Sequence, residues 1–153
     1  MESGAHIRLI LARATKAIET VDRVSIAQTG LNISDFAILE VLLHKGPLPV
    51  NTIGKKVLLT SGSMTTAANR LLRKGFIKRK QDPSDGRYFY LYLTATGRKL
   101  IEHAYEKHSR NLDKIAEVLT EEERTQLVLL LKKIGRHAHS LKPSNGRIDG
   151  LKL

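Results

Sequence analysis

The chain has 153 residues, no cysteine and a formal net charge of +11. A chain of this length can form one domain with a substantial core, or a small domain with an oligomerisation element. The lack of cysteine excludes disulfides, thiolate metal sites and cysteine nucleophiles, and without a membrane span or a signal-peptide pattern we expect a cytoplasmic protein.

The N-terminal third of the chain predicts two helices. Apolar side chains recur every three or four positions over residues 6–25, as they do on the buried side of an amphipathic helix. The pattern stops at Gly30, and Ser34 is a suitable N-cap for a second helix that ends at Gly46. Residues 47–50 are long enough for only a bridge of strand.

The next segment predicts a helix-turn-helix. A short helix over residues 51–58 contains Gly54, which costs about 1 kcal/mol relative to Ala and is expected where two helices cross closely. Thr60 or Ser61 can cap the helix that follows, and Gly75 can end it in the left-handed conformation.

The second helix of this motif has one apolar and one polar side. The apolar residues between Met64 and Leu72 follow the i, i+3, i+4, i+7, i+8 rule and predict a buried stripe. The opposite side presents the chemical groups that reach phosphates and base edges in nucleic acids. It consists of Ser63, Thr65, Thr66, Asn69, Arg70 and Arg73. We interpret it as the DNA-reading face of a winged helix-turn-helix.

Two strands joined by a turn follow. Residues 76–81 and 88–94 are the predicted strands, and in the second one apolar residues alternate with tyrosines, as in a half-buried sheet. The turn DPSDGR (82–87) combines Pro, which presets one dihedral angle, with Asp and Gly, which tolerate the others. We expect a hairpin with a basic tip, which is the candidate wing.

The C-terminal third predicts two long helices and a tail. Thr94 can cap the first helix, which runs to about Leu119. Residues 120–123 (TEEE) fit a capping box at the start of the second helix, where three acids face the positive end of the helix dipole. Residues 142–153 contain Pro and Gly and predict a flexible tail.

The helices at the two ends of the chain carry apolar stripes, which a monomer would leave largely exposed. We therefore expect a homodimer with two-fold symmetry, the alternative being that the stripes pack on their own chain. The predicted fold is mainly α with a small β-hairpin wing, an α+β class. Residues 1–30 and 100–141 are the expected dimerisation helices, and residues 31–99 the expected winged helix-turn-helix DNA-binding domain.

Almost all of the excess positive charge lies in the middle of the chain. Residues 55–99 contain eleven Lys and Arg and two Asp, a net charge of +9, whereas residues 1–54 have a net charge of 0 and residues 100–153 of +2. Such a cluster attracts a polyanion and supplies the counterion-release part of nucleic-acid affinity.

Individual residues of this segment suggest different contacts. Asn69 suits a bidentate contact with adenine and Arg70 one with guanine or phosphate, while Ser61 and the free amides at the helix start suit a phosphate. Other basic residues are expected to touch the DNA backbone or solvent without reading sequence. They are Lys55, Lys56, Arg73, Lys74, Lys78 and Lys80.

With these motifs the chain resembles the MarR family of bacterial transcriptional regulators over roughly residues 6–141. The most specific segments are LLTSGSMTTAANRLLRKGFIKR (58–79) and DPSDGRYFYLYLTATG (82–97). In that family an Asp-x-Arg near the wing tip, here Asp85-Gly86-Arg87, recurs together with a Leu-Thr-x-x-Gly after the second wing strand, here residues 93–97.

The resemblance implies a triangular dimer whose recognition helices enter successive major grooves of a palindromic operator, while the wings reach the adjacent minor grooves. By that match Arg87 is the wing-tip cation, and Asp85 steadies it or a nearby basic residue. Two departures are Gly86, where relatives often have a basic residue, and Leu72, where many have an acid. We therefore expect the wing to bind DNA less tightly than in those relatives, and no ion pair at Leu72. The predicted function is that of a sequence-specific DNA-binding transcriptional regulator that acts as a repressor.

Relatives often release DNA when a small aromatic or phenolic molecule enters a cleft between the dimer helices and the winged domain. The candidate lining residues are Phe36, Tyr105 and His108, which combine aromatic and polar character near this junction. Phe36 and Tyr105 can equally be ordinary core residues. No cofactor is predicted.

Two other functions compete with this interpretation. In an RNA-binding winged helix Tyr88, Tyr90 and Tyr92 would stack on unpaired bases, although they also fit a sheet packed beside a helix. A metal-responsive regulator would use some of the six histidines, but two nearby pairs are five and two residues apart and do not share a helix face. No metal site is predicted. An enzyme is not expected, because the chain has no phosphate-binding Gly-rich loop and no recognisable Ser-His-acid arrangement.

Overall fold

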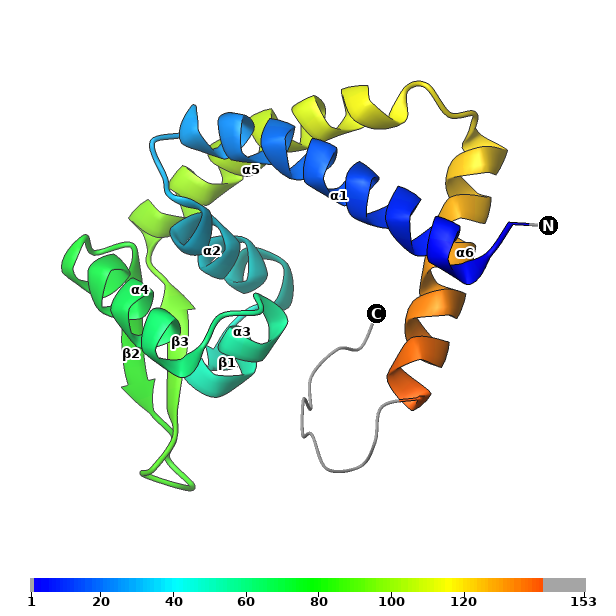
Figure 1. Cartoon of the computed structure of the whole chain (residues 1–153). Coiled ribbons are helices and arrows are strands. Elements are labelled where there is room, and N and C mark those ends of the chain that lie inside the picture. The colour runs from blue at the N-terminus through cyan, green and yellow to red at the C-terminus, as the bar shows by residue number, and fades with distance from the viewer. Residues whose placement is uncertain (1, 142–153) are drawn as a thin grey trace.

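The computed structural model describes residues 2–141, which form a mainly helical structure with a small antiparallel sheet (Figure 1). In chain order the elements are α1 (Gly4–Ala27), α2 (Ile33–Lys45), β1 (Leu48–Pro49), α3 (Val50–Lys56), α4 (Ser61–Arg73), β2 (Ile77–Gln81), β3 (Phe89–Leu93), α5 (Ala95–Ala116) and α6 (Glu121–Ser140). This architecture confirms the predicted mainly α fold with a hairpin wing. The predicted flexible tail, residues 142–153, lies outside the described residues.

A three-stranded sheet with the order β1-β3-β2 forms the wing and its base. β2 and β3 are the predicted hairpin, and they pair antiparallel from Ile77 opposite Leu93 to Gln81 opposite Phe89. The expected bridge of strand before α3 is β1, which pairs with the other edge of β3. The turn between β2 and β3 projects from the rest of the molecule as the loop at the lower left of Figure 1.

Most helix ends follow the local capping signals. Thr60 accepts a hydrogen bond from the backbone amide three residues ahead at the start of α4, and Thr120 and Glu123 form the predicted capping box at the start of α6. Gly75 follows α4 with a φ of 71°, and the amides of Gly75 and Phe76 bond back to carbonyls of the last turn. These three predictions are confirmed.

The predicted N-cap of the second helix is wrong. Helix α2 begins at Ile33, and Asn32 is the cap, because its side chain accepts a hydrogen bond from the Asp35 amide at 2.8 Å. The hydroxyl of Ser34 donates to Asn32 Oδ1 instead. Asn and Ser are equally good caps, so local preference does not choose between them. Tertiary packing does, because this start places Asp35 and Phe36 in the interior.

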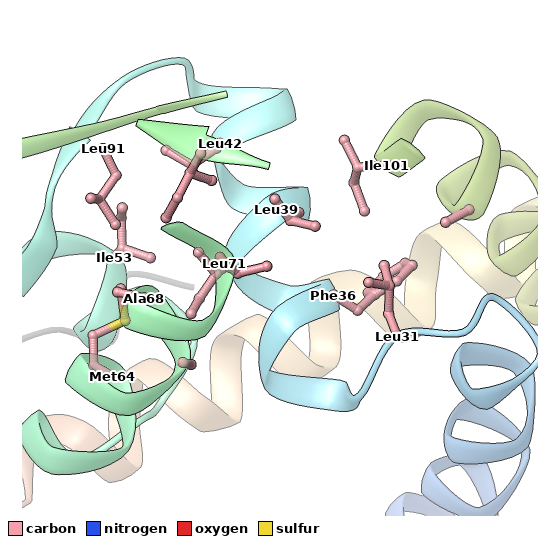
Figure 2. Packing of buried hydrophobic residues seen from close by; sticks show 14 of the residues in the cluster. Leu31, Phe36, Leu39, Leu42, Ile53, Met64, Ala68, Leu71, Leu91 and Ile101 are labelled. Carbon is pink, nitrogen blue, oxygen red and sulfur yellow. The ribbon is translucent and has the colours of Figure 1, made fainter. Parts of the chain in front are cut away.

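One hydrophobic core joins the winged segment to α5 (Figure 2). Its fully buried apolar side chains are Phe36, Ile38, Leu39, Leu42, Ile53, Leu71, Leu91 and Ile101. A Cβ on Gly54 would lie 3.4 Å from the Met64 side chain, which confirms that α3 and α4 cross closely there. Removing this apolar surface from water is the main force that holds α4 in place, with its polar side turned outward.

The Leu-Thr-x-x-Gly motif joins three elements. The Thr94 hydroxyl donates to the carbonyl of Gly75 at 2.7 Å, and its oxygen accepts from the amide of Gly97 at 3.0 Å. A Cβ on Gly97 would lie 1.9 Å from the carbonyl oxygen of Phe76, so no larger residue fits. Thr94 and Gly97 therefore fix the start of α5 against the segment that ends α4 and begins β2.

The terminal helices are poorly covered by the described part of the chain. α6 has no buried residue, and in Figure 1 it turns down from the far end of α5, on the side of the molecule opposite the winged segment. Large apolar side chains remain exposed on α1 and α6, namely Ile7, Leu9, Ile10, Ile18, Val21, Val24, Leu127, Val128, Leu129, Leu130, Leu131 and Ile134. None of the helices within residues 2–141 combines the length and the apolar character needed to cross a membrane.

Candidate nucleic-acid interface

Helix α4 presents the predicted polar face to solvent. Met64, Ala67, Ala68 and Leu71 are buried against the core, which leaves the opposite side of the helix free. The exposed residues on that side are Ser61, Ser63, Thr65, Thr66, Asn69 and Arg73. Small hydroxyls and an amide on an exposed helix can approach base edges closely, and the helix start carries amides that can bind a phosphate.

Arg70 differs from the other residues predicted to contact DNA. Its Nε donates to both carboxylate oxygens of Asp35, at 3.0 and 2.9 Å, and its Nη2 donates to Asp35 Oδ1 at 2.6 Å. Nη2 also donates to the Ser34 hydroxyl at 3.1 Å. The hydrogen bond to Asp35 raises the pKa of Arg70. The guanidinium is thus directed at the first turn of α2, and a contact with guanine by this residue stays a prediction.

The wing tip is organised around Asp85. Its Oδ1 accepts from the Arg87 amide at 3.0 Å, and its two oxygens accept from Arg87 Nε and Nη2 at 3.1 and 3.0 Å. These bonds from Arg87 lower the pKa of Asp85. On the other side of the turn Asp82 accepts from the Ser84 amide and hydroxyl, which lowers the pKa of Asp82. The Arg87 side chain remains 87% exposed, so the tip offers a cation that is oriented and accessible.

Strand β2 has two faces with different neighbours. Because residues opposite each other in an antiparallel pair share a face, Arg79 lies on the same face as its partner Leu91, which is buried against the helices. Lys78 lies on the other face, opposite Tyr92. Lys78 is among the DNA contacts predicted from the sequence, and Arg79 is not. The period of two from the buried Ile77 would have revealed the face of Arg79.

The surface between α4 and the wing is hollowed. This hollow has a volume of about 330 Å³ and brings together Thr65 and Asn69 of α4, Arg79 of β2, and Arg87 at the wing. Lys78 and Arg70 do not line it. The recognition-helix face and the wing-tip arginine therefore belong to one continuous surface, which is the geometry needed to hold a nucleic-acid backbone between them.

The residues predicted to line a ligand cleft are largely interior. The rings of Phe36 and His108 meet edge to face with centroids 4.8 Å apart, and both residues are buried. His108 Nδ1 shares a 3.0 Å hydrogen bond with the Ser25 hydroxyl, and its Nε2 lies 3.1 Å from Asp22 Oδ1. Tyr105 is half-buried, and its ring packs edge to face against the ring of His44. The three residues lie near the junction of α1, α2 and α5, as expected, but their role in ligand binding stays a prediction.

Residues 31–89 match the sequence model of the MarR family. The chain is 34% identical over 141 residues to YkoM of Bacillus subtilis, an uncharacterized HTH-type transcriptional regulator, with 92% of each chain covered. It is 35% identical over 137 residues to the HTH-type transcriptional regulator MhqR of the same organism, with 90% of this chain and 94% of that relative covered. The chain belongs to the MarR family. A crystal structure of NadR in complex with 4-hydroxyphenylacetate is similar as well, with a TM-score of 0.71, 28% identity, and coverage of 92% of this chain and 96% of NadR.

Membership of the MarR family makes this protein a winged helix-turn-helix transcriptional regulator that binds DNA, and its relatives are regulators rather than enzymes.

The tyrosines of the competing RNA interpretation lie on β3 and beside it, where Tyr90 and Tyr92 are half-buried and Tyr88 is exposed. Lys80 Nζ lies 5.5 Å from the Tyr92 ring. Within residues 2–141 no three His, Asp or Glu side chains are grouped so that they could hold a metal ion.

Proposed function

We propose that this MarR-family protein is a cytoplasmic repressor that binds a palindromic duplex operator as a homodimer and is released by a small aromatic or phenolic ligand. The observation that carries the proposal is the shared surface of α4 and the wing. There Thr65 and Asn69 line the same hollow as Arg87, within the segment that carries a net charge of +9. In this proposal α4 reads bases in the major groove, and Arg87 enters the neighbouring minor groove.

The exposed apolar side chains of α1 and α6 support a homodimer. Soluble monomers rarely expose contiguous apolar surface of this kind, and Leu129 and Leu130 on α6 are 63% and 54% exposed. A two-fold interface between the terminal helices of two copies would cover them. Two α4 helices related by such an axis would reach half-sites about one helical turn apart, which makes a palindrome the natural operator.

The ligand part of the proposal rests on the junction of α1, α2 and α5. Phe36 of α2 contacts His108 of α5, and the preceding residue Asp35 holds α4 through Arg70. A ligand that displaced Phe36 would therefore move the helix that positions α4. The similar NadR structure contains 4-hydroxyphenylacetate, a small phenol, and this supports a ligand of the same class here.

Selection of bound duplexes from a random pool tests the proposal. We expect a recovered sequence with two-fold symmetry, and a competition with single-stranded RNA of equal length should leave the duplex bound. Fluorescence anisotropy of the labelled duplex then measures release by small phenols, with 4-hydroxyphenylacetate as the first probe. Recovery of no preferred duplex would contradict the regulator proposed here, and release by no phenol would contradict the ligand part alone.

A further inference from the structure

We infer that Arg79 of β2 binds one phosphate of the duplex backbone in the hollow between α4 and the wing, beside Arg87. Lys78 and Lys80 of the same strand do not take part. The inference rests on the proposed duplex binding and adds a contact residue to it. Lys78, Arg79 and Lys80 are all exposed, and they differ in the face of the strand on which each one lies.

The strand register assigns the faces. Arg79 is opposite Leu91, whereas Lys78 and Lys80 are opposite Tyr92 and Tyr90. Opposite residues project from the same side of an antiparallel sheet, so Arg79 shares its side with the core-facing residue Leu91. The two lysines share the other side. Lys80 Nζ lies 5.5 Å from the Tyr92 ring, which agrees with that placement.

The charge around the hollow points to an anion. Of the residues that line it, Arg79 and Arg87 are the charged ones, and both are cations. Thr65 and Asn69 add a hydroxyl and an amide from the exposed side of α4. Asn51 and Tyr88 are further neutral polar residues of the lining. A concave surface with two guanidinium groups, several neutral polar side chains and no carboxylate in its lining matches the chemistry of a phosphate diester.

Arg79 is oriented in advance for this contact. Its guanidinium carbon lies 3.5 Å from the centroid of the Phe89 ring, so the planar group stacks on the aromatic face. Stacking uses the face of the guanidinium and leaves its N–H groups free at the edge, where they can donate to phosphate oxygens. In the described part of the chain, Arg79 forms none of the ion pairs with carboxylates.

The test compares Arg79→Gln with Lys78→Gln, because each variant removes one charge from adjacent positions on the same strand. Binding of the selected duplex is measured by anisotropy across a range of salt concentrations. Arg79→Gln should weaken binding about five- to tenfold at 0.1 M salt and reduce the slope of log K against log salt by about one unit, as loss of one phosphate contact does. Lys78→Gln should weaken binding clearly less than Arg79→Gln does, because Lys78 lies on the face of the strand that does not line the hollow.

A second experiment tests whether Arg79 contacts one particular phosphate. It also distinguishes the loss of that contact from a general loss of stability in the Arg79→Gln variant. Duplexes with a single neutral methylphosphonate are scanned along the half-site. At one position the substitution should weaken binding of the wild-type protein and of Lys78→Gln but not further weaken binding of Arg79→Gln. Equal losses for the two variants, or no position that couples to Arg79, would overturn the inference while duplex binding by the wild type stands. Failure of the wild type to bind any duplex would instead contradict the proposed function.

Discussion

Arg70 and Asp35 join the recognition helix α4 to the first turn of α2 by a two-pronged ion pair. The Asp35 side chain is fully buried and that of Arg70 is 28% exposed, and the shortest contact between them is 2.6 Å. A buried carboxylate is costly to leave unpaired, so the pair fixes where α4 can sit relative to α2. Since α2 also packs against α5, this contact lies between α5 and the exposed polar face of α4.

Substitution of either partner should therefore destabilise the fold. Arg70→Gln should lower the free energy of unfolding by about 3–5 kcal/mol, because it leaves the Asp35 carboxylate buried without a cation. The double variant Asp35→Asn with Arg70→Gln should lose clearly less than the sum of the single changes. Urea unfolding measures all three. Arg73→Gln, an exposed change on the same helix, is the control and should leave stability within about 0.5 kcal/mol. Additive losses would show that the two residues act independently.

The wing-tip arginine should affect DNA binding without affecting the fold. Arg87 is almost fully exposed, and an exposed ion pair such as that with Asp85 contributes little to stability. Arg87→Ala should weaken operator binding several-fold or more, while the unfolding transition and the dimer stay unchanged. Anisotropy measures operator binding, a thermal melt measures the unfolding transition, and light scattering measures the mass of the dimer. An unchanged affinity would count against the wing assignment.

Gly97 offers a test of the joint between the wing and α5. A methyl group at this position would lie 1.9 Å from the Phe76 carbonyl oxygen, which is backbone and cannot turn away. Gly97→Ala should therefore destabilise the protein by about 1–3 kcal/mol or more. Gly62→Ala is a matched control, because it also lies in a helix but has open space around its Cβ position, and it should be neutral or slightly stabilising. Thermal melts of the two variants should shift in opposite directions or by clearly different amounts.

The parts of the fold that sequence could predict are those decided by neighbouring residues. The caps at Thr60 and Thr94 bond to backbone amides three residues ahead, and Gly75 ends α4 with a positive φ. These roles could be predicted from residue type alone. The partner of Arg70 did not, because Asp35 lies 35 residues away and meets it only in the folded chain. The face of Arg79 is an intermediate case. Because side chains alternate between the two faces of a strand, this face can be predicted once Ile77 is recognised as a core residue.

Glu40 makes stability depend on pH in a defined direction. This residue is half-buried in α2, and burial raises the pKa of Glu40 above its usual 4.5. The positive charges of His44 and His108 oppose this rise, and the negative charge of Asp22 adds to it. The native state then holds a proton that the unfolded chain has released, so stability falls as pH rises from about 4.5 through the native pKa. Glu40→Gln removes this term. Its stability relative to wild type should increase over that interval in urea titrations, whereas exposed Glu117→Gln should show no such trend.

The exposed apolar side of α6 should be the part of the chain that holds two copies together. Leu130 is 54% exposed and lies among other exposed apolar residues of that helix. Leu130→Glu would place a charge within an interface that excludes water, and it should shift the protein toward monomers in light scattering at micromolar concentration. The monomers should bind a single half-site weakly and lose the preference for the full palindrome, because the two recognition helices are no longer linked. A Leu130→Glu variant that stays dimeric would show that the two copies associate through another surface.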